Sequence, residues 1–239
     1  MAKYWPAFFL PLTLGLLLLA FTKINHLFVK RNEGFSLHHI YSSLQERPEW
    51  NIAIEQDIKK VIPLLDQKFY YLKRGHQTYA FISADQKYVL KFYRFPSHMR
   101  KFSWATSPLS YFFGSSREET TRYNWRKLED SFSSYKLARE ELAEESGLLY
   151  VHLNPTKTLQ QKVQLIDRLG KQYEIDLDRT HCILQRKGNL LFPLLEKFKY
   201  QNDRIGIQKV TSGLIQLIAK RIKKGIEDKD EVLHKNYGW

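Results

Sequence analysis

Residues 68–93 read KFYYLKRGHQTYAFISADQKYVLKFY. Three short runs in this stretch are rich in aromatic and aliphatic residues, a composition typical of strands. They are Phe69-Tyr70-Tyr71-Leu72, Thr78-Tyr79-Ala80-Phe81-Ile82 and Tyr88-Val89-Leu90-Lys91-Phe92-Tyr93. Gly75 marks the first connection and Asp85-Gln86-Lys87 marks the second. The pattern predicts an antiparallel meander of three strands over residues 68–93.

The residues that follow the meander predict helices. Residues 94–130 are basic and aromatic, and we interpret them as an insertion in which a helix starts near Glu118. Residues 131–147 predict a clearer helix, because they contain many Glu residues and close at Gly147.

The C-terminal third alternates between strand and helix patterns. Residues 163–167 and 173–177 alternate in polarity around a short turn and predict a second hairpin. Residues 182–185 predict a further strand. Apolar residues recur at helical intervals over residues 203–225, which predicts a long helix.

An uncharged run near the N-terminus is the strongest signal before the meander. Tyr4 to Thr22 is nineteen residues without a charge, and a helix needs about 20 mostly apolar residues to cross a hydrocarbon layer roughly 30 Å thick. We expect a retained transmembrane helix. The alternative is a cleaved secretory signal with Lys3 as its charged region, but Ala20-Phe21-Thr22 matches a cleavage site poorly.

Positive charge is more abundant after this run than before it. Lys23, Lys30 and Arg31 follow the run, whereas Lys3 and the terminal amine precede it. By the positive-inside rule, the bias predicts a single-pass membrane protein with its soluble domain in the cytoplasm. The single cysteine, Cys182, agrees, because one thiol cannot form an internal disulfide.

The segment between this run and the meander has two parts. Residues 32–50 contain Gly34, Pro48 and scattered polar residues, and we interpret them as a linker with little structure. Residues 51–67 carry apolar side chains at intervals of three and four and predict a helix.

The chain has a large excess of positive charge, with a formal net charge of +13. A basic surface held next to a membrane is attracted to anionic lipid headgroups, which we expect as partners beside the membrane itself. The sequence shows neither a zinc-type spacing nor a nucleic-acid-binding motif, so we expect no nucleic-acid partner.

The order of the predicted elements resembles the protein-kinase-like fold over roughly residues 66–239. That order is a hairpin, a third strand with a central Lys, an acidic helix, further strands, a long helix and an Asp-rich loop ending in Asn. The resemblance implies an α+β fold after the transmembrane helix, with an antiparallel sheet plus helix as the N-lobe and a partial helical C-lobe. The implied division is an anchor with its flanks at 1–31, a linker and helix at 32–67, the N-lobe at 68–200 with an insertion at 94–130, and the partial C-lobe at 201–239.

The resemblance implies roles for one strand residue and one helix residue. Lys91 lies where the kinase third strand carries a Lys that binds nucleotide phosphates and pairs with a helix Glu. We choose Glu141 as that partner and Glu140 next. The alternatives are a solvent-facing Lys on an edge strand and a solvated run of Glu.

The first turn of the meander occupies the place of the kinase Gly-rich loop. It has one glycine, Gly75, and the resemblance implies that His76 and Gln77 add side-chain contacts to the phosphates of ATP. The alternative is an ordinary hairpin turn.

The acidic tail resembles the kinase catalytic loop. Ile226-Glu227-Asp228 is similar to its start and Asn236-Tyr237-Gly238 to its end, which implies Asp228 as the base and Asn236 as a ligand of Mg²⁺. The Asp-to-Asn separation is longer than in kinases, so Asp230 is an alternative base. Asp and Asn are also common turn residues.

A kinase needs a further metal-binding Asp and a helical lobe after the Asn, whereas this sequence ends at Trp239. We therefore expect a membrane-anchored, kinase-like, nucleotide-binding protein that is inactive or truncated as a phosphotransferase. The alternative is a non-enzymatic anchored interaction module, whose basic insertion meets lipid headgroups or a protein partner.

Overall fold

The predicted meander forms the middle of the sheet in a computed structural model, which describes residues 5–42, 44–54, 56–95, 114–157 and 159–227. Strands β1 (Lys68–Arg74), β2 (Thr78–Ser83) and β3 (Tyr88–Tyr93) pair antiparallel in sequence order, so this prediction is confirmed. Short turns join them because Gly75 and the Asp85 region each reverse the chain within a few residues.

Four more strands extend the sheet on both sides of the meander. On one side β7 (Cys182–Arg186) pairs antiparallel with β3, and β4 (Leu148–His152) pairs with β7. On the other side β5 (Lys162–Ile166) and β6 (Gln172–Asp176) form the predicted second hairpin. The order is β4-β7-β3-β2-β1-β5-β6. The sheet is mixed rather than wholly antiparallel, because β5 runs parallel to β1.

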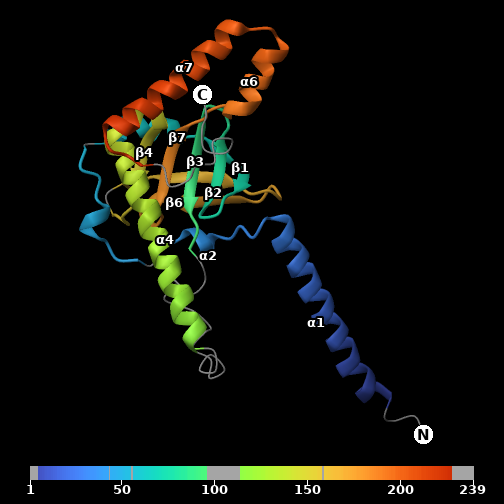
Figure 1. Cartoon of the computed structure of the whole chain (residues 1–239). Helices are drawn as coiled ribbons and strands as arrows, with labels where there is room; N and C mark the ends of the chain where they lie inside the picture. Colours follow the sequence, from blue (N-terminus) through green and yellow to red (C-terminus); the bar gives the residue numbers. More distant parts are fainter. Residues whose placement is uncertain (1–4, 43, 55, 96–113, 158, 228–239) are drawn as a thin grey trace.

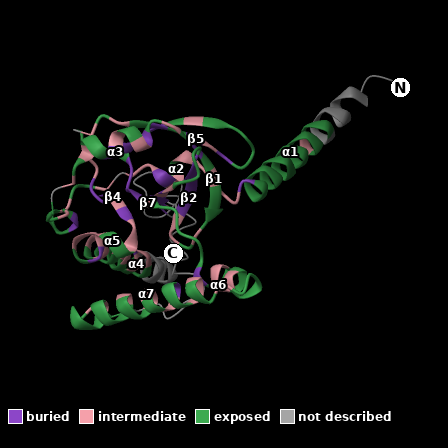
Figure 2. Cartoon of the chain, turned by 90° about the horizontal axis from the view of Figure 1, so that it is seen from above, coloured by how far each residue is buried: buried purple, intermediate pink, exposed green. Residues whose placement is uncertain are grey.

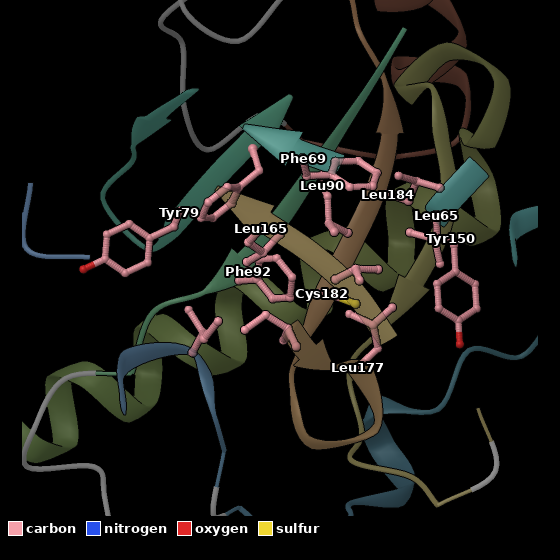
Figure 3. Close-up of a cluster of buried hydrophobic side chains, with 14 of the residues drawn as sticks. Leu65, Phe69, Tyr79, Leu90, Phe92, Tyr150, Leu165, Leu177, Cys182 and Leu184 are labelled. Atoms are coloured by element: carbon pink, nitrogen blue, oxygen red, sulfur yellow. The ribbon is translucent and has the colours of Figure 1, made fainter. Parts of the chain in front are cut away.

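One face of the sheet carries the larger hydrophobic core. Successive side chains of a strand point to opposite faces, and alternate residues of the meander gather here. Figure 3 shows this cluster, which includes Phe69, Tyr79, Leu90, Phe92 and Leu184. Helix α3 (Ile58–Leu65) adds Val61 and Leu65 to this core, and it is shorter than the helix predicted over 51–67.

The other face is covered in part by α4 (Gly114–Glu141), which follows β3 as predicted. Its Leu128 and Phe132 pack against Tyr93 and Ile183 of the sheet. The two separate helices predicted on either side of residue 130 are wrong, because no Gly or Pro interrupts the chain there and α4 continues through it. After α4, the short helix α5 (Ala143–Ser146) ends at Gly147, whose φ of 66° is a common helix-terminating conformation.

The segment 32–50 is a structured part of the domain, so its interpretation as a linker is wrong. It contains helix α2 (Leu37–Ile40) and a 3-10 turn, η1 (Pro48–Trp50). Phe35 and Ile40 are buried in the larger core, and Trp50 is buried against α4. These large apolar residues are too irregularly spaced to predict a helix or a strand, yet their burial ties the segment to the sheet.

A helical pair follows β7. Helix α6 (Leu191–Tyr200) leads into α7 (Arg204–Lys223), which confirms the long helix predicted over 203–225. Asp203 caps α7 by accepting a hydrogen bond from Gly206 N at 2.8 Å. Most of α7 is exposed, as Figure 2 shows.

Helix α1 (Trp5–Arg31) extends away from the sheet domain (Figure 1). From Thr13 onward its Leu and Phe side chains are exposed. Within the described residues, α1 is the one helix that is long and apolar enough to cross a membrane.

Candidate functional site

Lys91 lies on an interior strand and shares a row of side chains with four neighbouring strands. Lys73 of β1 pairs with Ala80 of β2, and Ala80 pairs with Lys91 of β3. The row continues through Ile183 of β7 to Val151 of β4. Because directly paired residues project from the same face, the row has a basic end and an apolar end. The alternative of an edge-strand Lys91 is therefore wrong.

The apolar end of the row is covered, whereas the basic end brings two cations together. Ile183 and Val151 belong to the core that α4 completes with Leu128 and Phe132. Lys73 and Lys91 flank the small side chain of Ala80, two strand spacings or roughly 10 Å apart along the sheet. We call Lys73, Ala80 and Lys91 the basic row.

Burial lowers the pKa of Lys91 from its ordinary value, and repulsion from Lys73 lowers it further. Among the described residues no ion pair joins Lys91 to a carboxylate. A partly buried ammonium group beside another cation is stabilised by an anion, because the anion offsets both the desolvation and the repulsion. Phosphate oxygens have the charge and hydrogen-bonding capacity to do this.

The turn between β1 and β2, which contains Gly75, His76 and Gln77, is held by its neighbours. Gly75 N donates to Thr78 O at 2.8 Å and closes the turn. Arg94 donates from Nη2 to His76 O at 2.9 Å and from its backbone N to Gln77 O at 2.7 Å. The Gln77 side chain also contacts Ser131 of α4. The turn is therefore anchored to both β3 and α4, and the guanidinium of Arg94 is a further cation beside it.

The predicted pair of Lys91 and Glu141 is not formed. Glu141 is the last residue of α4, and its Oε2 lies 2.5 Å from Nζ of Lys224, just beyond the end of α7. The next choice, Glu140, accepts a hydrogen bond from Ala53 N at 2.6 Å. Both carboxylates are at the C-terminal end of α4, and their partners there are Lys224 and the backbone of Ala53.

The remaining predicted residues belong to the acidic tail. Asp228, Asn236 and the alternative base Asp230 lie outside the described residues. Between residues 5 and 227, wherever the structure describes the chain, no three His, Cys, Asp or Glu side chains gather closely enough to hold a metal ion. The described residues therefore do not supply a carboxylate set for Mg²⁺.

Lys73 is a site residue that the sequence did not predict. The β1–β2 register shifts between Tyr71 and Lys73. Without this shift Lys73 would lie opposite Tyr79, on the face of the larger core. The irregularity turns Lys73 to the face of Lys91, and strand alternation alone could not reveal it.

Comparison with models of protein families, with curated proteins and with solved structures finds no match to this chain, so the candidate site rests on its own geometry.

Proposed function

We propose that this chain is a membrane-attached, kinase-like protein that binds the phosphates of ATP at the basic row. Helix α1 would hold it in a membrane with the sheet domain on the cytoplasmic side, the side that Lys30 and Arg31 favour. The observation that carries the proposal is Lys91, a partly buried cation in the middle of a sheet, with Lys73 on the same face and no carboxylate partner among the described residues.

The arrangement of elements around Lys91 supports the proposal. The strand of Lys91 is the third of a meander, and the helix that follows it packs on the same face. In kinases a Lys on the third strand and a loop between the first two strands contact the nucleotide phosphates. Here the Gly75–Gln77 turn, with Arg94 beside it, would approach the phosphates from the end of the hairpin.

Phosphoryl transfer by this chain is expected to be weak or absent. Kinases pair the strand Lys with a Glu, which orients the ammonium group toward the phosphates. Glu141 is paired with Lys224 instead, and Glu140 with the backbone of Ala53. Without an orienting carboxylate, Lys91 would bind phosphate without holding it in the geometry that transfer requires.

The test is calorimetric titration of ATP into the full chain in detergent micelles. Lys91→Met is expected to weaken binding by about 10–100-fold, because a hydrogen bond to a charged group contributes about 1.5–3 kcal/mol. Lys87→Met removes an exposed cation from the β2–β3 turn and is the matched control, with unchanged affinity expected. No ATP binding by the wild-type chain, or equal binding by wild type and Lys91→Met, would refute the proposal.

A further inference from the structure

The C-terminal end of α1 is built into the sheet domain. Gly34 N donates to Val29 O at 2.8 Å, and Glu33 adopts a φ of 48°, which together terminate the helix. Next to this end, Asn32 Nδ2 donates to Asp167 Oδ2 at 3.0 Å. Asp167 lies in the turn between β5 and β6, so the base of α1 is bonded to that turn.

Four further contacts fix the same junction. Glu33 Oε1 lies 2.5 Å from Arg168 Nη1, and Glu33 Oε2 accepts the hydroxyl of Tyr71 at 2.9 Å. Phe35 packs edge-on against Tyr79, with a centroid separation of 5.3 Å. The hydroxyl of Tyr173 donates a hydrogen bond to Asp167 at 2.9 Å. Burial is the largest cause that raises the pKa of Tyr173 to about 12, and this hydrogen bond is the second. The turn and the helix end therefore hold a defined position relative to each other.

A hollow lies between α1 and the β5–β6 turn. Its lining residues are Leu27, Lys30, Arg31, Arg168 and Leu169, which we call the juxtamembrane pocket. Three of them are cations and two are apolar. The carboxylate of Glu33 offsets one cation through Arg168, which leaves an excess of positive charge. A ligand for this lining has a negatively charged group and an apolar portion.

The position of the pocket along α1 indicates which ligand meets it. The uncharged run from Tyr4 to Thr22 is centred on Thr13. At 1.5 Å per residue, Leu27 lies ~21 Å and Lys30 ~25 Å from this centre along the helix. The headgroup layer of a bilayer ends roughly 20–22 Å from the midplane. Helix side chains also tilt toward the N-terminus, which directs Lys30 back toward the headgroups.

We propose that the juxtamembrane pocket binds the headgroup of an anionic phospholipid. The cations Lys30, Arg31 and Arg168 contact the lipid phosphate, and Leu27 and Leu169 form the apolar side of the pocket at the level of the headgroups. The proposal is independent of nucleotide binding at the basic row, and it requires α1 to lie in a membrane.

The test is native mass spectrometry of the full chain, released from micelles that contain either phosphatidylglycerol or phosphatidylcholine. The wild-type chain is expected to bind phosphatidylglycerol more tightly. The triple variant Lys30→Gln, Arg31→Gln, Arg168→Gln is expected to lose at least about tenfold in that affinity, since each basic residue near an anionic headgroup contributes about 1 kcal/mol.

A control variant tests whether the pocket itself, and not overall charge, binds the lipid. The control replaces three exposed lysines around α6 and α7 by glutamine: Lys187→Gln, Lys199→Gln, Lys209→Gln. It removes the same charge as the pocket variant and is expected to keep the wild-type affinity. Unchanged affinity in the pocket variant, or an equal loss in both triple variants, would overturn the proposal.

Discussion

Helix α1 and the α6–α7 pair are both attached to the sheet domain, but through different kinds of contact. The base of α1 is held by buried groups, namely Asn32, Phe35 and Asp167. The end of α7 is held by the ion pairs of Lys220 with Glu145 and of Lys224 with Glu141, which are largely open to solvent.

The difference shows which attachment is expected to resist separation. Exposed ion pairs contribute about 0–1 kcal/mol each, because solvent screens them and two long side chains must be ordered. A buried aromatic ring or a buried, fully bonded carboxylate contributes several times more. Only Leu191 and Val210 are buried among the residues of α6 and α7. The contacts at the base of α1 are therefore buried like those of the protein core, whereas the contacts of α6 and α7 are mostly of the kind found on the surface.

The largest effect is expected from Phe35→Ala. Phe35 is 6% exposed and contacts four aromatic rings, so its removal leaves a cavity between the sheet and the base of α1. We expect a loss of about 3–5 kcal/mol in the free energy of unfolding. Denaturant titration of the full chain in micelles measures it. Phe192→Ala, at a residue of α6 that is 47% exposed, is the control and should cost far less. Equal losses of stability in the two variants would contradict the proposed difference between the α1 junction and the α6–α7 attachment.

A smaller effect is expected from Asp167→Asn. Oδ1 of Asp167 accepts backbone N–H groups from Leu169 and Lys171 at 2.9 Å, and Oδ2 accepts Asn32 and Tyr173. In asparagine an NH2 group takes the place of one of these oxygens. The two hydrogen bonds that this oxygen accepts are lost, because the NH2 group is itself a donor. We expect a loss of about 1–3 kcal/mol in the same titration. Glu196→Gln on exposed α6 is the control, and an equally small change in both variants would mean that the buried bonds add little.

The smallest effect is expected from Glu145→Gln, at the α7 attachment. The hydrogen bond from Lys220 lowers the pKa of Glu145, against the opposing effect of burial. A lowered folded-state pKa stabilises the protein above the unfolded value of about 4.5, and this contribution disappears as pH falls through the folded value. We expect the variant to lose no more than about 1 kcal/mol at pH 7 and nothing at pH 2. Unfolding midpoints at both pH values provide the comparison, and a difference that grows on acidification would contradict the assigned pair.

Local composition and pattern predicted six of the seven strands and helix α7. The runs around Tyr79 and Leu90 are rich in aromatic and aliphatic residues, and residues 203–225 repeat with the period of a helix. Strand β4 was not predicted, and the longest helix, α4, was divided in two. Long-range partners could not be predicted in this way. Glu141 meets Lys224 across 83 residues, and Asn32 meets Asp167 across 135. Neither pairing leaves a periodic signal, and the parallel contact of β5 with β1 depends on the path of the whole intervening chain.

The termination of α1 at Glu33 and Gly34 also has a geometric consequence. No flexible tether separates the helix from the sheet. If α1 spans a bilayer, the number of residues in α1 therefore sets both the height of the domain above the bilayer and its rotation about the helix axis. One residue inserted into α1 would rotate the whole sheet by about 100° around the helix axis and raise it by about 1.5 Å. Distances from a label on β3 to the lipid phosphates would report that rotation. In that arrangement, the length of α1 would determine which side of the sheet faces the membrane, and whether the basic row does.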